Sequence, residues 1–221
     1  MNLLAFVTAS LLALAHANTE KTVFVVPPSI SYNSNFGRLE KLQLDTLNQS
    51  SPSLRKALPV AFPSSQYPHG LQSWYLLEDL NKDQRYEVRA CWAATQPTNF
   101  WLEVFTPGEV LQNSELLRSI DLFIQHRQEP FEPSSYRASD VLLLRVEAAA
   151  DFFTTNKTRM HNPPPVDVDI ILDPFILNVF PSSLKQTALY IVLLAIGSYF
   201  ISGAIWSRLT QYVSAGKEHK D

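Results

Sequence analysis

An uncharged apolar stretch near the C-terminus, at residues 188–206, constrains this chain more than any other feature. It reads ALYIVLLAIGSYFISGAIW and contains no Asp, Glu, Lys or Arg. At a rise of 1.5 Å per residue, about 20 apolar residues cross the roughly 30 Å hydrocarbon core of a bilayer. Tyr190 and Trp206 lie near its two ends, where amphipathic rings favour the membrane interface. We therefore expect residues 187–207 to form a transmembrane helix rather than a buried core helix.

A shorter apolar run at the N-terminus indicates export. Residues 3–15 are apolar, and the sequence AHA at residues 15–17 is a small-x-small cleavage site before Asn18. The run is too short to cross a bilayer stably. We interpret residues 1–17 as a cleaved signal peptide, with an uncleaved anchor as the alternative.

These two apolar segments together predict a single-pass type I topology. Residues 18–186 would form a lumenal or extracellular domain, and residues 208–221 would form a cytosolic tail. The tail carries Arg208, Lys217 and Lys220, in agreement with the excess of basic residues in cytoplasmic segments.

Composition excludes some functions and favours others. The net charge of −3 argues against nucleic acid as a partner, because phosphate binding requires clustered Lys and Arg. The 15 Pro and only 6 Gly favour strands joined by stiff turns over a helical bundle. The single cysteine, Cys91, allows no internal disulfide, so the exported domain must be stabilised by its core. That fits a resident of the endoplasmic reticulum better than a cell-surface protein.

Two N-glycosylation sequons fall in the exported part. They begin at Asn48 and Asn156, whereas Asn162 is followed by Pro163 and is excluded. We expect Asn48 and Asn156 to be glycosylated.

Alternating apolar residues predict a mainly β domain. In residues 86–92 the apolar side chains alternate with Glu87 and Arg89, which predicts a half-buried strand. Residues 100–105 alternate in the same way and would form a hairpin-like pair with it. Further strands are expected at residues 22–26, 74–77, 141–146 and 166–172, with a long irregular connection at 29–72 that includes one short strand.

The type of β fold is indicated by Leu80, which lies six residues before Tyr86. This spacing is typical of the tyrosine corner of immunoglobulin-like sandwiches, in which the hydroxyl bonds the upstream backbone. We predict an immunoglobulin- or fibronectin-III-like sandwich. Residues 109–128 fit either a helix or a strand. Residues 173–183 are expected to lie at the lumenal membrane interface, with their apolar side in the headgroup region.

Candidate catalytic residues are few. Asp167 and Asp169, with Asp173 nearby, resemble the Asp-x-Asp metal site of some sugar transferases. On an extended strand, however, Asp167 and Asp169 share a face opposite an apolar face, which is typical of a solvated strand surface. The paired acids Glu78 and Asp79 are interpreted as a solvated turn.

The remaining side chains that could ligate a metal or act as nucleophiles do not form a recognisable set. His69, His126 and His161 lack metal-ligand spacing. Cys91 is expected to be a buried thiol. We expect no catalytic residue, cofactor or metal.

Small residues in the apolar stretch leave two interpretations open. Gly197, Ser198, Ser202 and Gly203 would allow close approach of a partner helix, but an ordinary anchor often contains a few such residues.

The layout resembles a known family. The carrying stretches are residues 18–27, residues 80–92 with YEVRACW, and the sequence DPF at 173–175 before one C-terminal span. They are similar to the fungal coactivator subunit of GPI mannosyltransferase II. The resemblance implies a non-catalytic subunit of the endoplasmic reticulum membrane, surrounded by membrane lipid. Its partner would be a multi-span mannosyltransferase that adds the second mannose to the GPI precursor.

The predicted tail lacks a recognisable retrieval signal, and three other functions are compatible with the sequence. Residues 217–221 depart from a dilysine retrieval signal, so retention would come from the partner. A subunit of the first GPI mannosyltransferase would have a similar topology. A cell-surface adhesion or receptor domain is the second alternative. A lumenal enzyme using Asp167 and Asp169 is the third.

Overall fold

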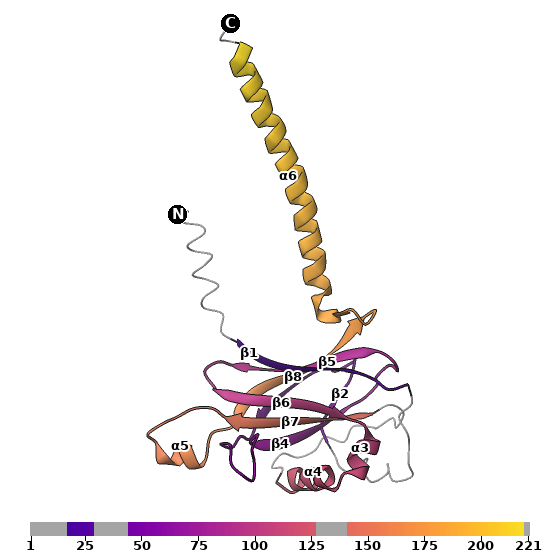
Figure 1. Cartoon of the computed structure of the whole chain (residues 1–221), viewed down its shortest axis with the longest axis vertical. Coiled ribbons are helices and arrows are strands. Elements are labelled where there is room, and N and C mark those ends of the chain that lie inside the picture. The colour runs from indigo at the N-terminus through magenta and orange to yellow at the C-terminus, as the bar shows by residue number, and fades with distance from the viewer. Residues whose placement is uncertain (1–16, 29–43, 127–140, 219–221) are drawn as a thin grey trace. The chain divides into compact units, whose positions relative to one another are not determined.

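The computed structural model describes residues 17–28, 44–126 and 141–218, and it divides the chain into two units (Figure 1). The first unit is Met1–Val179 and the second is Phe180–Asp221. The predicted signal peptide lies outside the described residues, apart from Ala17, which begins the first strand.

The first unit is a β structure with three described helices. Its strands are β1 (Ala17–Val25), β2 (Thr46–Leu47), β3 (Ser53–Leu58), β4 (Leu71–Leu77), β5 (Arg85–Ala93), β6 (Thr98–Phe105), β7 (Leu142–Ala150) and β8 (Val166–Ile176). Its helices are α3 (Pro107–Gln112), α4 (Ser114–His126) and α5 (Lys157–His161). The prediction of a mainly β domain is therefore confirmed.

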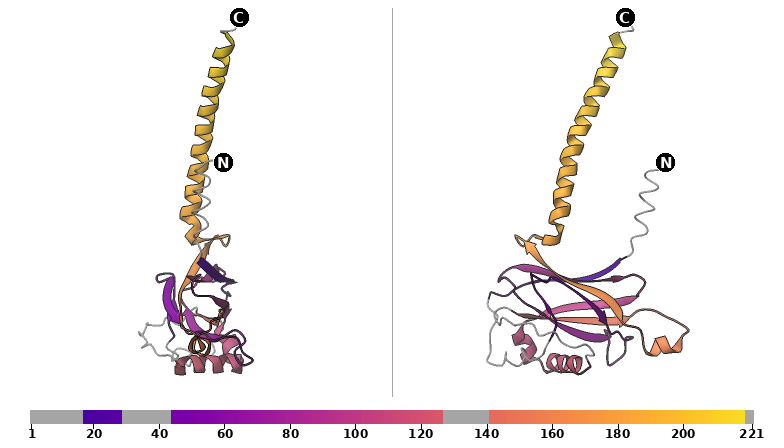
Figure 2. Two further views of the ribbon diagram at one scale, coloured as in Figure 1. Left: turned by 90° about the vertical axis from the view of Figure 1, so that its left-hand side faces the viewer. Right: turned by 180° about the vertical axis from the view of Figure 1, so that it is seen from behind.

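The strands form two sheets that lie face to face (Figures 1 and 2). One sheet has the order β1-β5-β8-β3 and the other has the order β2-β4-β7-β6. The chain changes sheet between β3 and β4, between β4 and β5, between β5 and β6, and between β7 and β8. Such crossings are typical of Greek-key and jelly-roll sandwiches. An immunoglobulin constant domain instead pairs the consecutive strands A with B, D with E and F with G. The observed strand order therefore does not support the predicted immunoglobulin or fibronectin-III type.

The predicted hairpin of residues 86–92 and 100–105 is wrong in its pairing. Both segments are strands, but β5 pairs with β1 and β8, whereas β6 pairs with β7 in the other sheet. The turn between them takes the chain from one sheet to the other. Periodicity assigns faces to a strand but does not identify its neighbour, which explains the error.

One large apolar core fills the space between the sheets. Tyr86, Val88 and Ala90 of β5 face Leu142, Leu144 and Val146 of β7 across it. The core residues of β8 and β6 alternate along their strands in the same way, so each sheet turns one face towards this core; they are Val166, Val168, Ile170, Leu172, Phe100 and Leu102.

A second apolar cluster covers the outer face of the β4-β7 sheet. Trp74 and Leu76 of β4 and Leu143 of β7 pack against Val110 of α3 and Ile120 of α4. Figure 1 shows both helices on the side of this sheet that faces away from β1. Strand β4 is consequently buried on both faces.

Local capping explains why residues 107–126 are helical. Thr106 and Glu109 form a capping box, and Pro107 occupies the first turn of α3. The Oδ1 atom of Asn113 accepts hydrogen bonds from the backbone N–H groups of Glu115 and Leu116 at the start of α4. The choice between helix and strand that the sequence left open is thus decided by the caps.

Two further segments differ from expectation. The described part of 29–72 contains β2, β3 and the start of β4 rather than one short strand, while residues 29–43 lie outside the described residues. Strand β8 continues to Ile176, and Phe175 is buried, so residues 173–176 belong to the sheet. Three consecutive Pro residues at 163–165 separate α5 from β8.

The second unit consists mainly of one long helix. It comprises the short strand β9 (Phe180–Pro181), a 3₁₀ turn (Ser182–Leu184) and helix α6 (Lys185–Glu218). The predicted span of 187–207 lies inside α6, and the helix continues through most of the predicted tail.

Candidate functional site

Helix α6 presents its apolar side chains outward along its described length. The stretch Ser182–Thr210 is long enough to cross a membrane, and its most apolar 18-residue window has a mean hydropathy of 2.0 with no residue buried inside the described part of the chain. The exposed fractions of Leu189, Ile191 and Phe200 within the chain are 62%, 59% and 68%. The described residues therefore supply no apolar surroundings for the apolar stretch of this helix, which suits contact with lipid or another helix.

Gly197 and Gly203 of α6 are not required by any close contact with the described part of the chain. A Cβ atom added to Gly197 or Gly203 would meet no heavy atom within 4 Å. Around Gly203 the helix surface forms a shallow groove, lined by Tyr199, Phe200, Ser202, Gly203, Ala204, Trp206 and Ser207. The Oγ atom of Ser207 donates to the carbonyl of Ala204 in its own helix, so this hydroxyl does not need a partner. A close helix contact would fit this face.

Tyr86 forms the corner that the sequence predicted. The backbone N–H of Asn81 donates to its hydroxyl at 3.0 Å, which is the expected bond to the upstream chain. Gln49 donates to the same oxygen at 2.8 Å, and the hydroxyl donates to Gln84 at 3.1 Å. The ring is fully buried and stacks on Phe24 with centroids 5.9 Å apart. This corner ties the β2–β3 loop to the β4–β5 loop.

The two sequons lie in turns with different exposure. Asn156 is exposed and caps α5, with its Oδ1 accepting from the N–H groups of Thr158 and Arg159. Asn48 is half-buried, and its Oδ1 accepts from the N–H of Ser51 at 2.7 Å. Figure 1 shows α5 on a loop that projects beyond the ends of the strands. Because the carbonyl oxygen makes the bond in both turns, the amide nitrogen of each Asn is left to carry a sugar.

The two acids of the Asp-x-Asp pattern do not form a metal site. Asp169 is held by Arg55 from β3 through two bonds of 2.8 Å each. The hydrogen bond to this carboxylate, with its charge, raises the pKa of Arg55. Asp167 is exposed on the same outer face. Within the described residues, no group of three or more His, Cys, Asp or Glu side chains could hold a metal ion.

A buried charge network lies on the outer face of the β1-β5-β8 sheet. Glu87 and Asp173 are each 4% exposed, although they point away from the core. Lys21 binds Glu87 at 3.0 Å, and the guanidinium of Arg89 lies 3.6 Å from Glu87 and 3.7 Å from Asp173. The alternation predicted the outward direction of Glu87 and Arg89 correctly, but it gave no sign that the acids would be covered.

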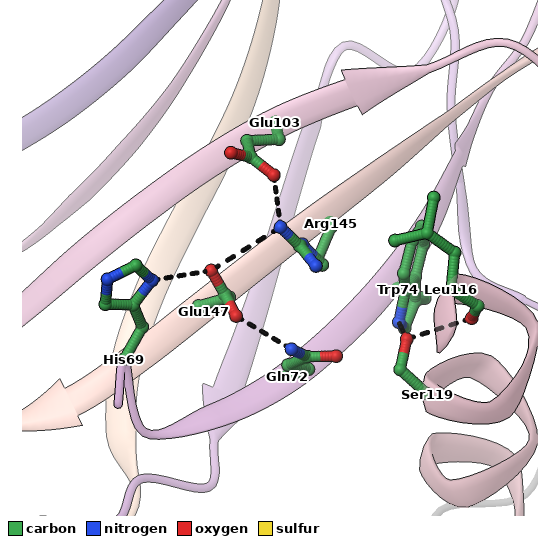
Figure 3. A network of polar contacts seen from close by, with 8 residues as sticks. All are labelled: His69, Gln72, Trp74, Glu103, Leu116, Ser119, Arg145 and Glu147. Atoms are coloured by element: carbon green, nitrogen blue, oxygen red, sulfur yellow. Dashed lines mark hydrogen bonds and ion pairs between the residues drawn. The ribbon is translucent and has the colours of Figure 1, made fainter. Parts of the chain in front are cut away.

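A second polar network lies on the outer face of the β4-β7-β6 sheet (Figure 3). Glu147 of β7, 6% exposed, accepts from Gln72 at 2.7 Å and pairs with His69 at 3.1 Å. Arg145 bridges Glu147 and Glu103 of β6. The ring of His69 stacks on a tryptophan of β6 with centroids 4.3 Å apart. Most of these groups bind one another, although the buried Gln72 Oε1 and Arg145 Nε atoms have no hydrogen-bond partner among the described residues. The pairing of the carboxylates favours a structural role.

The sequence contains a local pattern that indicates part of this network. Arg145 and Glu147 alternate with apolar residues inside an otherwise apolar strand, which places both on the outer face of β7. In the same view, Trp74 donates to Ser119 of α4 at 3.1 Å, and Ser119 donates to the carbonyl of Leu116. The outer face of this sheet is thus apolar under the helices and charged beside them.

The prediction that Glu78 lies in a solvated turn is wrong. Glu78 is only 7% exposed, and its burial, together with the charge of Asp79, raises its pKa. Asp79 itself is exposed and has a φ of 53°. Cys91 is half-buried, not fully buried, and its sulfur accepts from the hydroxyl of Thr19 at 3.7 Å.

The histidines do not converge. His69 belongs to the network of Glu147, whereas the ring of His161 bonds the carbonyl of Lys157 in α5. His126 is the last residue of α4, and its side chain lies outside the described part. The two described histidine contacts therefore belong to separate places, a network between strands for His69 and one helical turn for His161.

One protein-family model matches most of the chain. The family model of Pga1, described as GPI-mannosyltransferase II co-activator, matches residues 8–205. The chain belongs to the Pga1 family. No curated protein and no solved structure matches it.

The Pga1 match covers both units. It includes every described strand of the β unit and continues through α6 to residue 205, next to the aromatic residue at the end of the apolar stretch. Membership in the Pga1 family links the chain to the membrane machinery of GPI-anchor biosynthesis and to a mannosyltransferase that it assists. The resemblance inferred from the sequence is confirmed.

Proposed function

We propose that this chain is a non-catalytic subunit of GPI mannosyltransferase II, required for adding the second mannose to the GPI precursor. The observation that carries this proposal is the co-activator family match over residues 8–205, because it spans both the β unit and the apolar helix. A co-activator that shares both units with its family is expected to use both: the helix beside the partner in the membrane, and the β unit beside the partner's loops.

The proposed location is the endoplasmic reticulum membrane, with type I topology and the β unit in the lumen. The apolar helix supports anchoring, and the basic residues after it support a cytosolic C-terminus. The disulfide-free core supports a reticulum resident. We further propose that Asn48 and Asn156 carry glycans, which only lumenal sequons acquire.

The charged side chains of the β unit favour a supporting role over catalysis. Asp169 is neutralised by Arg55, and the buried Glu87 and Glu147 are each held by cationic or amide partners. A general acid or nucleophile needs access to substrate, which the buried Glu87 and Glu147 lack, while the accessible Asp169 is occupied by its ion pair. The chemistry is therefore assigned to a multi-span catalytic partner.

Depletion of the chain provides the decisive test. If it supports the second mannosyltransferase, depleted cells accumulate GPI precursors that carry one mannose. Precursors without mannose would instead assign the chain to the first mannosyltransferase. A normal precursor profile would overturn a role in either step.

Partner binding through α6 is tested by co-purification in mild detergent. We expect Gly203→Leu to reduce recovery of the multi-span transferase, because the added side chain fills the groove around residue 203. Ile201→Phe is the matched control, since residue 201 lies on the opposite side of the helix. Equal recovery with both variants would contradict packing through this face.

Glycan processing tests location and topology together. Core glycans that are sensitive to endoglycosidase H, and are lost in Asn48→Gln and Asn156→Gln, would agree with a lumenal β unit in the reticulum. Extended glycans would favour the cell-surface alternative. Unmodified sequons in cells would argue against a lumenal β unit.

A further inference from the structure

The turn that ends the β unit exposes two large apolar side chains. Leu177 is 88% exposed and Val179 is 72% exposed. Leu177 and Asn178 have φ values of 50° and 57°, a region that residues with side chains rarely adopt. The backbone of this turn thus holds the side chain of Leu177 outside the core of the β unit, in a conformation that costs free energy.

The turn is nevertheless held firmly by the β4–β5 loop. The side-chain amide of Asn178 donates to the carbonyl of Asp83 at 2.9 Å, and its Oδ1 accepts from the N–H of Arg85 at 2.8 Å. Gln84 of the same loop donates to the carbonyl of Phe175 at 3.0 Å, and the N–H of Val179 donates to the carbonyl of Ile176 at 2.9 Å. These bonds fix the directions of the two apolar side chains relative to the sheet.

The surface beside this turn is apolar and basic. The guanidinium of Arg85 lies 5.7 Å from the centre of the Phe175 ring, and Arg85 is exposed. Val25, its register partner on β1, is 51% exposed. Apolar side chains beside a cationic one suit the boundary between lipid headgroups and acyl chains.

The length of the chain brings this turn to the membrane. Ser182, three residues after Val179, begins the 3₁₀ turn that leads into α6, and the apolar stretch begins at Ala188. Three extended residues reach at most about 11 Å, and the 3₁₀ turn with the first turn of α6 adds about 10 Å. The headgroup layer on each side of the hydrocarbon core is about 5–8 Å thick. Residues 177–179 are therefore held within about 21 Å of the hydrocarbon core if α6 crosses the bilayer, and the headgroup layer is within their reach.

We propose that Leu177 and Val179 insert into the lumenal lipid surface and that the Asn178 clamp makes this turn a rigid contact between the β unit and the bilayer. The ligand is the headgroup–acyl boundary of the membrane that α6 crosses. The proposal rests on the proposed membrane anchoring. It differs from the interface predicted from the sequence, because residues 173–176 belong to β8 and only the turn contacts lipid.

The test uses the full chain in phosphatidylcholine vesicles, with a Cys91→Ser background and an environment-sensitive NBD label. Labels are placed through Leu177→Cys or Val179→Cys, which keep a side chain at each backbone position. Phe153→Cys is the matched control, because Phe153 is 86% exposed within the same unit but is distant in sequence from the span. Ile196→Cys reports insertion of α6.

We expect labels at 177 and 179 to show blue-shifted emission, loss of quenching by aqueous iodide, and quenching by nitroxide-bearing lipid. The label at 153 should behave as a water-exposed group. Leu177→Cys combined with Asn178→Ala should lose most of the blue shift, because the clamp no longer directs the turn.

The outcomes separate this inference from the proposed function. If the label at 196 is protected but those at 177 and 179 resemble the label at 153, lipid insertion of the turn is overturned while anchoring stands. If 177 and 179 become protected only when the catalytic subunit is present, a protein covers the turn and the lipid proposal also fails. Exposure of the label at 196 would remove both proposals.

Discussion

Large apolar side chains are mostly buried in the β unit and mostly exposed on helix α6. The β unit buries most of its large apolar residues in two clusters, one between the sheets and one under α3 and α4. Helix α6 leaves those of its apolar stretch largely exposed within the chain. The first unit is therefore stabilised by its own core, whereas the apolar stretch of the second is not covered by any described residue. Mutations in the two units should accordingly affect different measurements.

The largest effect on the β unit is expected for Trp74→Ala. Trp74 of β4 is fully buried against α3 and α4, and its indole N–H donates to Ser119. Removing the ring should lower the free energy of unfolding by about 3–5 kcal/mol. Urea unfolding of the full chain in detergent, followed by tryptophan fluorescence, measures this loss. Phe153→Ala should change the stability little, and an equal loss there would contradict the described core.

The corresponding experiment on α6 is Ile196→Lys. A lysine at the centre of a transmembrane helix costs about 2.5–3.5 kcal/mol on insertion. We expect part of the protein to become extractable by alkaline carbonate, while the urea midpoint of the β unit is unchanged. Ile196→Leu keeps the residue apolar and should stay in the membrane. A shift of the urea midpoint with Ile196→Lys would show that the two units are not independent in stability.

The same contrast explains how much of the fold the sequence could predict. The helix was predicted because a long uncharged stretch is a local signal that needs no knowledge of neighbours. The strand at 86–92 was predicted because its period of two is equally local. The pairing of β5 with β1 and β8 depends on contacts between residues far apart in the chain, which no local pattern contains.

The site residues divide in the same way. The tyrosine corner was predictable because Leu80, Asn81 and Tyr86 lie within seven positions of one another. The burial of Glu78 and Glu147 was not, because it depends on which loops and strands cover them. The turn at Leu177 was placed near the membrane by the sequence, but its clamp by Asn178 requires the β4–β5 loop to lie alongside β8.

A smaller effect is expected for Tyr86→Phe. The substitution keeps the buried ring but leaves the N–H of Asn81 and the side chain of Gln49 without their shared acceptor. Losing a buried hydrogen-bond partner should cost about 1–3 kcal/mol. The urea midpoint should fall with no change in membrane extraction. Tyr67→Phe, at a 38% exposed position, is the control and should be nearly neutral.

The smallest effect is a pH dependence that only the β unit should show. The pKa of Glu78 is raised in the folded state by burial and by the charge of Asp79, from an ordinary value of 4.5. In the interval between 4.5 and the raised value, the folded state therefore binds more protons than the unfolded state. The free energy of unfolding should fall as pH rises through this interval, because an ionised carboxylate must then remain buried.

Glu78→Gln removes this titration and sharpens the contrast between the units. The variant should gain stability relative to the parent as pH rises above 4.5, and the gain should vanish at lower pH, where both side chains are neutral. Urea unfolding at several pH values measures the difference, with the exposed Glu20→Gln as control. Because α6 contains no acid within its apolar stretch, membrane extraction should not follow the same curve. A gain that is equal at all pH values would assign the effect to packing rather than to the buried charge.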